Sequence, residues 1–374
     1  MDLGYIFVND SRASLSAESN LFHVRPVVAL LYTACLVLAT SIGTTGNILI
    51  IVTVVVNKKL RSIENTFIVN LAIADLCVTG FVDPFSIVGV FKGERYFIEN
   101  PVLCEIVASV CLTSCFCSLL SIGAISFNRY VHICHQSVYS KIYSPKKCIV
   151  MVVGLWVVSF CLEMPNFIGW GDHVFDHKTR SCVWDRTADF SYTLFFVLVG
   201  VVLPLIVISV CYARIFLFVR RAKQRIAQSG DQSDLKQKKE RQDSIKLART
   251  LFIIFVMFTL CWTPYAFMVV LDVNDTFAME LHAFSILLAH TNSSINCVLY
   301  GVFNNNFRKG YKDLLMCVSC KRLWAGDSRL APMRSGQCSE NTQIHSVTAT
   351  DVSPSTRSPS YLFQVKVVDR EPCA

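Results

Sequence analysis

The chain has 374 residues, of which 53% are hydrophobic and only 17% charged, and its formal net charge is +8. A soluble domain carries about 25% charged residues, so this composition excludes an ordinary soluble protein and indicates a surface that faces lipid. The 17 cysteines do not indicate a disulfide scaffold, because most of them lie inside apolar runs, where a free thiol behaves as a small hydrophobe.

Seven apolar segments follow a polar N-terminal stretch. This stretch lacks the basic start, apolar run and small-residue cleavage site of a secretory signal, so we expect no cleavable signal peptide. A membrane-spanning helix needs roughly 20 mostly apolar residues. The spans that we predict are Val27–Val56, Thr66–Phe91, Leu103–Ile133, Cys148–Gly169, Tyr192–Val219, Leu247–Leu271 and Leu281–Phe303. The predicted fold class is an all-α membrane protein, with an extracellular segment at residues 1–26 and a seven-helix bundle at residues 27–303.

Two further segments follow the bundle. Residues 304–320, "NNNFRKGYKDLLMCVSC", have the pattern of a short amphipathic helix on the inner leaflet, with large apolar residues toward the membrane. These residues are Phe303, Phe307, Tyr311 and Leu315. Cys317 and Cys320 are candidates for palmitoylation, with plain reduced thiols as the alternative. Residues 321–374 are rich in Ser, Thr and Pro, and we expect a disordered cytoplasmic tail.

The distribution of basic residues predicts the orientation of the bundle. Lys and Arg are concentrated in the connections that follow spans one, three and five, and the other connections contain few. By the positive-inside rule, the basic connections and the C-terminus lie in the cytoplasm, and the N-terminus lies outside. Asn9 and Asn274 begin glycosylation sequons on the predicted outer side. A third sequon, at Asn292, lies inside span seven and is expected to be unused.

One acidic residue, Asp75 in "NLAIADL", falls at the centre of a span. A charged residue at mid-membrane costs about 2.5–3.5 kcal/mol on insertion scales, so we expect polar partners around it. The candidate partners in spans three and seven are Ser118, Asn292, Ser293 and Asn296. A water-filled hydrogen-bond network explains such a set without any bound ion.

Other spans carry landmarks of their own. Pro264 in "TLCWTPY" removes a backbone hydrogen bond and kinks a helix, with Trp262 just before it and Phe258 one turn earlier. Cys104 and Cys182 both lie on the predicted outer side, where a disulfide can persist. Span three ends in "NRYVHICHQSVYSKIYS", and span seven ends in "NCVLY".

These landmarks together resemble the rhodopsin-like G-protein-coupled receptors over about residues 27–320. The stretches "NRYVHICHQSVYSKIYS" and "NCVLYGVFNNNFRKGY" are similar to the melatonin receptors within that family. The resemblance implies a plasma-membrane receptor that transmits an extracellular small-molecule signal to a heterotrimeric G protein, with Gi/Go favoured. It also implies arrestin and kinases as partners of the tail, membrane lipids around the bundle, no enzymatic activity, no nucleic-acid partner, and no cofactor other than an allosteric sodium ion.

The resemblance further implies roles for individual residues. It pairs Cys104 with Cys182, makes Asp75 and its polar neighbours the ligands of sodium, and makes Trp262 the residue that senses ligand. Arg129, once released from its partners, lines the groove that accepts the C-terminal helix of the G protein. The coupling and switch residues are Asn128, Arg129, Tyr130, Tyr212, Phe258, Trp262, Pro264 and Tyr300.

The cytoplasmic motifs depart from the family at three positions. Asn128 replaces the acid of the usual D/E-R-Y, and Ser244 stands at the span-six position that often holds the arginine. With both electrostatic restraints on Arg129 weakened, we predict appreciable basal activity, because an off state favoured by less free energy is less populated. Cys297 replaces the proline of N-P-x-x-Y, so span seven is expected to kink less.

The outer half departs further from the melatonin receptors. Asn166 matches a melatonin-contacting asparagine, but Arg186, Gly200 and His290 stand where a glutamine, a histidine and a tyrosine are expected. Cys111 replaces the aspartate of amine receptors, and His290 occupies the place of the opsin lysine. The candidate ligand contacts are Cys111, Leu112, Cys115, Asn166, Trp184, Phe196, Trp262, Tyr265, Val269, Ile286 and His290. This wall is mostly apolar and aromatic, which predicts a small planar or lipid-like ligand.

Other interpretations stay open. Asp83 and Glu163, in the outer halves of spans, either meet a cationic ligand group or bond a neighbouring helix. An orphan rhodopsin-like receptor for a lipid or peptide is one alternative. A transporter or channel would need repeats or several charged residues along one path, and we find neither. An intramembrane enzyme would need a motif such as H-E-x-x-H or G-x-S-x-G, and none lies in the spans.

Overall fold

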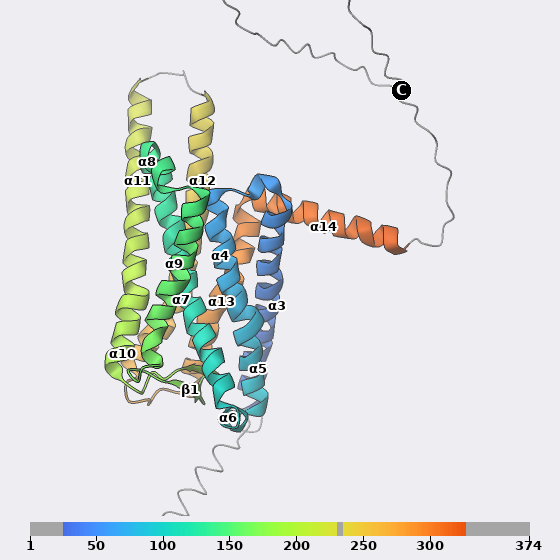
Figure 1. Ribbon diagram of the computed structural model, residues 1–374, viewed down its shortest axis with the longest axis vertical. Helices are drawn as coiled ribbons and strands as arrows, with labels where there is room; N and C mark the ends of the chain where they lie inside the picture. Colours follow the sequence, from blue (N-terminus) through green and yellow to red (C-terminus); the bar gives the residue numbers. More distant parts are fainter. Residues whose placement is uncertain (1–24, 230–234, 327–374) are drawn as a thin grey trace, which may run out of the picture. The chain divides into compact units, whose positions relative to one another are not determined.

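The fold is a bundle of long helices, seen in a computed structural model that describes residues 25–229 and 235–326 (Figure 1). Seven segments in these ranges are long and apolar enough to cross a membrane, which confirms the predicted number of spans. They are Pro26–Val56, Ile63–Lys92, Pro101–Cys134, Pro145–Asn166, Phe190–Arg221, Arg249–Leu271 and Met279–Phe303. All seven belong to one compact unit, Met1–Leu323. Span four ends at Asn166, earlier than the predicted Gly169.

The spans are built from the following elements. Spans one to four are α3 (Pro26–Val56), α4 (Ile63–Cys77) with α5 (Asp83–Lys92), α7 (Pro101–Cys134), and α9 (Pro145–Glu163) with the 3₁₀ turn η3 (Met164–Asn166). Spans five to seven are α10 (Phe190–Phe195) with α11 (Leu203–Ser229), α12 (Leu235–Leu271) and α13 (Met279–Phe303). The shorter helices are η1 (Lys58–Leu60), α6 (Glu94–Ile98), α8 (Gln136–Ile142) and α14 (Asn305–Gly326).

Local sequence signals determine where several helices begin and end. Ser62 and Ser144 cap α4 and α9, each accepting a hydrogen bond from the backbone N–H three residues later, at 3.3 and 3.4 Å. Pro145 then occupies the first turn of α9, where no N–H is required. Gly93 ends α5 with φ of 71°, a conformation that other residues adopt only at a cost. These signals explain why the observed ends differ from the hydropathy boundaries by a few residues.

Two wide π turns, η2 (Val78–Val82) and η4 (Phe196–Val202), interrupt spans two and five. One residue separates each π turn from a proline, Pro84 in span two and Pro204 in span five. The backbone N–H of that residue donates a hydrogen bond to the carbonyl five positions earlier. A proline ring clashes with the carbonyl four residues before it, and the wider turn accommodates that clash. In span two the extra residue also places Asp83 inside the bundle, where it is 1% exposed.

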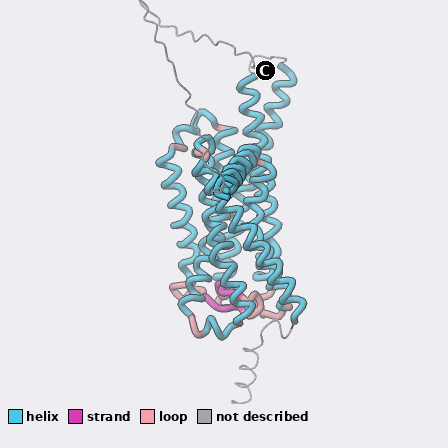
Figure 2. Tube along the Cα trace, turned by 90° about the vertical axis from the view of Figure 1, so that its right-hand side faces the viewer, coloured by secondary structure: helices cyan, strands magenta, loops and turns pink. Residues whose placement is uncertain are grey.

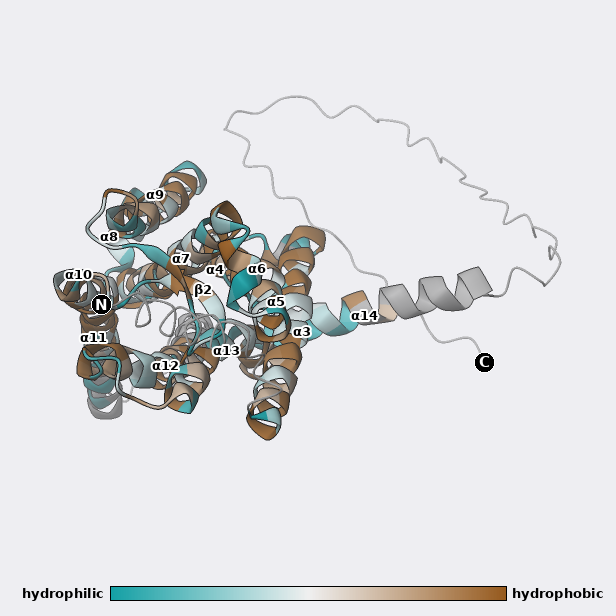
Figure 3. Ribbon diagram, turned by 90° about the horizontal axis from the view of Figure 1, so that it is seen from below, coloured by the Kyte–Doolittle hydropathy of each residue, from teal (hydrophilic) through white to brown (hydrophobic). Residues whose placement is uncertain are grey.

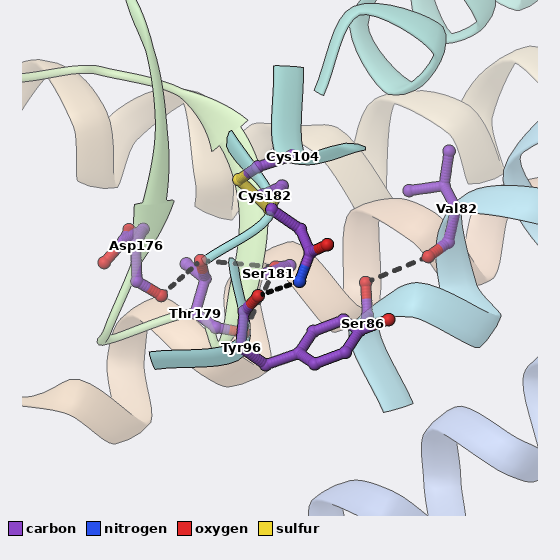
Figure 4. The surroundings of a disulfide bond; sticks show 9 residues. Val82, Ser86, Tyr96, Cys104, Asp176, Thr179, Ser181 and Cys182 are labelled. Carbon is purple, nitrogen blue, oxygen red and sulfur yellow. Dashed lines mark hydrogen bonds between the residues drawn. A yellow bond between two sulfur atoms is a disulfide. The ribbon is translucent and has the colours of Figure 1, made fainter. Parts of the chain in front are cut away.

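One end of the bundle, which we call the strand end, carries a small hairpin. Strands β1 (His173–Asp176) and β2 (Ser181–Trp184) pair antiparallel, with Phe175 opposite Cys182, and Figure 2 shows them in magenta at the lower end of the helices. Cys182 is bonded to Cys104 at the start of α7, which confirms the predicted disulfide (Figure 4). The hairpin is thereby tied across the bundle.

The opposite end, which we call the basic end, carries α8 and α14. The prediction that Phe307 of α14 faces the membrane is wrong, because its side chain is fully buried against Tyr300 and Tyr311, at ring distances of 5.5 and 6.2 Å. Phe303 is 47% exposed, as expected for a lipid-facing residue. The first turns of α14 therefore pack on the bundle.

The outward faces of the helices are apolar, as Figure 3 shows in brown. Val150, Phe216 and Leu260 are 71%, 65% and 60% exposed, and exposure of this kind suits a surface that contacts lipid. The polar residues of the spans lie inside instead, with Asp75 and Asn47 fully buried. Asn9 and the side chains of Ser244, Cys317 and Cys320 lie outside the described residues.

Candidate functional site

A narrow cavity lies beneath the hairpin, between α7, η4, α12 and α13. Its wall consists of Ala108, Cys111, Leu112, Cys115, Val183, Trp184, Phe196, Trp262, Tyr265, Ile286 and His290. The structure brings together here every predicted ligand contact except Asn166 and Val269, and it adds Ala108 and Val183. A second cavity continues toward the basic end and shares Leu112, Cys115, Phe196 and Trp262 with the first. The two cavities reach from the hairpin to the middle of the bundle.

Asn166 lies behind this wall. Its Nδ2 donates to the Tyr192 hydroxyl at 2.7 Å and to Glu163 Oε2 at 3.0 Å. The other Glu163 oxygen bonds His173 Nε2 at 2.5 Å and Ser109 Oγ at 3.1 Å. Of the two interpretations of Glu163, the structure favours the bond to neighbouring elements. The short η3 turn directs Asn166 toward these partners, and residue types alone do not reveal that direction.

Three side chains from different helices form a line at the cavity wall. Asp83 Oδ1 of α5 lies 2.9 Å from His290 Nδ1 of α13, and His290 Nε2 lies 3.5 Å from Cys111 Sγ of α7. Asp83 Oδ2 also accepts a hydrogen bond from Thr40 of α3 at 3.4 Å. Asp83 therefore bonds neighbouring helices, because η2 turns it inward.

Gly200 stands at the position where the melatonin-receptor pattern has a histidine, and its surroundings show why a larger side chain does not fit there. A Cβ placed on Gly200 would overlap the ring of Phe116, which fills the space where a longer span-five side chain would project. Phe116 in turn packs on Phe196, with ring centroids 5.3 Å apart. The ring of Phe116 from span three therefore occupies the space of the expected histidine, and this part of the wall is apolar.

Trp262 lines both the cavity beneath the hairpin and the second cavity. Its ring stacks on Phe258 at 5.9 Å and meets Tyr265 edge-on at 6.1 Å. Pro264 lies two residues later inside α12. Among the described residues, the indole N–H of Trp262 has no hydrogen-bond partner, so little besides ring packing holds this side chain in its position.

The Asp75 carboxylate lies in a fully buried polar centre between α4, α7 and α13. It accepts hydrogen bonds from Ser118 Oγ at 2.9 Å and Asn296 Nδ2 at 2.8 Å, and Ser293 is a further donor. Within the described ranges, the amide oxygens of Asn292 and Asn296 are buried without a hydrogen-bond partner. The orphaned oxygen of Asn296 belongs to the side chain that bonds the Asp75 carboxylate, and such oxygens are the ligand type that a hard cation prefers, so this centre fits a sodium ion.

At the basic end, Arg129 is held by a residue that the sequence reasoning missed. Its Nη2 donates to Glu64 Oε2 of α4 at 2.6 Å, and the arginine side chain is only 3% exposed. Glu64 lies in the first turn of α4, next to the basic connection after span one. The sequence could have indicated this ion pair, because Glu64 is acidic and lies at the same membrane level as Arg129. The prediction that the electrostatic restraints on Arg129 are weakened is therefore incomplete, because an acid from span two supplies an ion pair.

Asn128, which takes the place of the usual acid before Arg129, bonds the connection after span three. Its Nδ2 donates to the hydroxyl of Tyr139 in α8 at 3.2 Å. Tyr130 contacts the same connection, with its hydroxyl 2.9 Å from His135 Nε2. The residues on either side of Arg129 thus fasten the loop between spans three and four.

Two tyrosines lie deeper at the basic end. The Tyr212 hydroxyl accepts a hydrogen bond from Ser126 Oγ at 3.3 Å. Tyr300 is fully buried, and its hydroxyl has no partner within the part of the chain that the structure describes. A buried hydroxyl without a partner costs roughly 1–3 kcal/mol, which favours a rearrangement that satisfies it.

Ion pairs join the hairpin to the connection between α12 and α13. Lys178 Nζ lies 2.6 Å from Asp275 Oδ1, and Arg186 pairs with the same carboxylate. Burial alone would raise the pKa of the Asp272 carboxyl, but hydrogen bonds from His282 and from two backbone N–H groups lower it to about 2. Asn274, the second predicted glycosylation site, is exposed in this connection.

Comparisons with known proteins match this architecture. The sequence model of the family described as "7 transmembrane receptor (rhodopsin family)" matches residues 46–300. Melatonin receptor type 1C of Xenopus laevis is 35% identical over 284 residues, covering 74% of this chain and 66% of that receptor. Melatonin receptor type 1C of Gallus gallus is 33% identical, covering 78% of this chain and 83% of that receptor. Melatonin receptor type 1B of Homo sapiens is 32% identical over 299 residues, covering 78% and 80%.

The fold itself is similar to that of a solved structure. The crystal structure of squid rhodopsin superimposes with a TM-score of 0.69, covering 81% of this chain and 93% of that one. The sequence identity is 21%, so this likeness concerns the arrangement of the helices alone.

Proposed function

This chain belongs to the rhodopsin family of seven-transmembrane receptors, and from that premise we propose that it binds a small apolar ligand beneath the hairpin and activates Gi/Go proteins. It is a melatonin-receptor-like, multi-pass protein of the plasma membrane whose partners are an extracellular ligand and a G protein. The strand end faces outward and the basic end faces the cytoplasm. Its output is nucleotide exchange on the G protein rather than chemical conversion of a ligand.

One observation carries the proposal, namely the position of Trp262 between the two cavities. A ligand in the cavity beneath the hairpin would contact the Trp262 ring directly. This ring stacks on Phe258, and both residues belong to α12, the helix that contains Pro264. A ligand shifts an equilibrium only through contacts that differ between two states. Trp262 supplies such a contact, because its indole N–H has no hydrogen-bond partner among the described residues to hold it in one position.

The chemistry of the wall limits the ligand. Apart from Cys111, Cys115 and His290, the cavity beneath the hairpin is lined by aliphatic and aromatic side chains. A planar or lipid-like molecule with few polar groups suits that lining. Melatonin is the first compound to test, given the names of the relatives. The apolar filling at Gly200 and Phe116 and the hidden position of Asn166 favour a different ligand.

A sodium ion at Asp75 is a further part of the proposal. Asp75, Ser118, Asn292, Ser293 and Asn296 would hold it, and the ion would supply positive charge that offsets the buried carboxylate. Arrestin and kinases bind the Ser/Thr-rich tail, Asn9 and Asn274 carry glycans, and Cys317 and Cys320 carry palmitate. These assignments follow from the sequence patterns.

The test is guanine-nucleotide exchange by purified Gi with the receptor in lipid nanodiscs. We expect exchange above that of empty nanodiscs, a larger response with Gi than with Gs, and loss of the response in Arg129→Ala. Trp262→Ala should retain basal exchange and lose the response to any ligand found by screening. Exchange by Gi that is equal with the wild type, Arg129→Ala and empty nanodiscs would overturn the proposal.

A further inference from the structure

The line of Asp83, His290 and Cys111 has the arrangement of an activated nucleophile. The carboxylate bonds one imidazole nitrogen at 2.9 Å and the thiol sulfur lies 3.5 Å from the other. The three residues come from three helices and are 1%, 5% and 7% exposed. A thiol, a base within hydrogen-bond distance and a third group that orients the base are the features that activate cysteine nucleophiles.

The same geometry excludes a single metal ion held by all three residues. Asp83 and Cys111 lie on opposite nitrogens of the imidazole ring, so their oxygen and sulfur atoms cannot converge on one point. A relay is the arrangement that remains. With Nδ1–H donated to Asp83, Nε2 is left as the acceptor of the thiol proton.

We propose that Cys111 is a covalent attachment site for electrophilic lipids, namely fatty aldehydes or ketones with a C=C bond conjugated to the carbonyl. The proposal rests on the proposed function, because the site is the ligand cavity itself. Cys111 lines that cavity beside Leu112, Ile286 and Phe196, which suit an alkyl chain. The reaction modifies the receptor once and does not turn over.

The reaction is an addition that balances without any other reactant. His290 Nε2 takes the proton from Cys111, and the thiolate attacks the β-carbon of the unsaturated carbonyl compound. The S–C bond forms as the C=C π bond breaks, and its electron pair moves to the carbonyl as an enolate. The proton on His290 then passes to the α-carbon. The net change is addition of S–H across the double bond, and nothing is oxidised or reduced.

Cys115, whose thiol is hydrogen-bonded to that of Cys111, is the internal comparison for Cys111. It lies one turn further along α7, lines the same cavity and has the same 7% exposure. Its sulfur is not bonded to an imidazole in the described part of the chain. The titratable groups around Cys111 are His290, Asp83, Tyr265 and Cys115, with Tyr32 beyond Asp83. A pH profile of the two thiols therefore separates activation by His290 from simple access.

The experiment treats full-length receptor in nanodiscs with 2-nonenal or with acrolein, and measures the modified peptides by mass spectrometry over time. At pH 7 we expect Cys111 to react about 100-fold faster than Cys115. Its rate should change little between pH 7 and pH 9, while that of Cys115 rises with pH. His290→Gln should remove about 100-fold of the Cys111 rate. Asp83→Asn, which removes only the positioning residue, should slow Cys111 and restore a rise with pH.

The outcomes separate this proposal from the proposed function. Equal rates at Cys111 and Cys115, no reaction of Cys111 with either aldehyde, or an unchanged rate in both variants would overturn it. The Cys115 rate and thermal melting show whether each variant has folded, and Asp83→Asn decides if His290→Gln does not fold. Gi exchange by Cys111→Ser is measured in parallel. A receptor that signals without selective labelling refutes only this inference, and labelling without exchange refutes only the proposed function.

Discussion

At the scale of single residues, the acid that pairs with Arg129 belongs to span two and not to span three. Asn128, the residue before Arg129, bonds Tyr139, whereas Glu64 of span two bonds Arg129. A carboxylate at 2.6 Å from a buried guanidinium restrains it wherever the acid lies in the sequence. The prediction of appreciable basal activity, which rested on Asn128 and Ser244 alone, therefore requires a second condition, namely loss of the Glu64 contact.

The first prediction concerns this pair. Glu64→Gln keeps the size of the side chain and removes its charge, so the inactive state should lose about 1 kcal/mol, since Glu64 is partly exposed. That loss corresponds to about fivefold more active receptor and higher basal exchange by Gi. Glu99→Gln, which breaks an exposed pair with Arg95 at the strand end, is the matched control and should leave basal exchange unchanged. Equal basal exchange in both variants would show that Glu64 does not restrain Arg129.

At the scale of elements, the close approach of α3 and α13 depends on small residues. A Cβ on Gly46 would overlap the sulfur of Cys297, and one on Gly43 would overlap Ser294 and Thr79. Small residues let membrane helices approach until their backbones are nearly in contact. Cys297, which replaces the expected proline, keeps its backbone N–H, and α13 runs as one helix from Met279 to Phe303.

The second prediction tests this contact. Gly46→Ala should destabilise the receptor by about 1–3 kcal/mol through overpacking, measured as a lower melting temperature in nanodiscs. Gly154→Ala in α9 is the control, because a Cβ there meets no heavy atom within 4 Å. The double variant Gly46→Ala with Cys297→Ala should recover part of the loss, since it removes the sulfur but keeps the Cys297 Cβ, which would lie 2.8 Å from the new methyl group. No recovery would place the cost of the substitution elsewhere.

The third prediction concerns the ion pairs that close the strand end. Asp272 has a pKa of about 2 in the folded state, below its unfolded value of about 3.9. A depressed pKa contributes stability above the unfolded value, and this contribution is lost as pH falls toward 2. The contribution of Asp272 to the melting temperature should therefore be constant from pH 7 to pH 5 and should be lost below about pH 4.

A variant identifies the group responsible for that loss. Asp272→Asn should lower the melting temperature at pH 7 and flatten its decline between pH 4 and pH 2. Glu105→Gln, at an exposed position on α7, should keep the slope of the wild type. An unchanged slope in Asp272→Asn would assign the acid sensitivity to other carboxylates, of which Asp275 is the nearest candidate because its pKa is also lowered.

At the scale of the whole molecule, three sites lie one after another through an apolar bundle. The cavity wall with Trp262, the buried Asp75 centre and the Arg129–Glu64 pair all contact α7, which touches most of the other spans. Each of these sites contains a group whose partners can change. One example is the indole N–H of Trp262, which has no hydrogen-bond partner among the described residues. A rearrangement of the helices can therefore pass from the cavity to the basic end.

The fourth prediction tests the central part of this path. If sodium binds at Asp75 and favours the inactive state, sodium at ten times its dissociation constant should stabilise the receptor by about 1.4 kcal/mol. The melting temperature should rise, and basal exchange should fall, in sodium chloride relative to potassium chloride at equal concentration. Asp75→Asn should abolish both differences. Equal behaviour in the two salts with the wild type would leave a water network as the explanation of the polar centre.

The sequence by itself determined the seven spans, whereas the pairing of Cys104 with Cys182 and most of the cavity wall were implied by its resemblance to a receptor family. Hydrophobic runs act locally, so their effect can be read one segment at a time. Trp262 and Asp75 were found for the same reason, because an unusual residue inside an apolar run has few explanations.

Only the tertiary structure decided which side chains meet. Glu64 joins Arg129, Asp83 joins His290 and Cys111, Phe116 fills the space at Gly200, and Asn166 turns away from the cavity. Each of these contacts depends on the rotation of one helix against another, and in span two on the extra residue of η2. Rotation about a helix axis is set by packing with neighbours far away in the chain, and no single segment of the sequence contains that information.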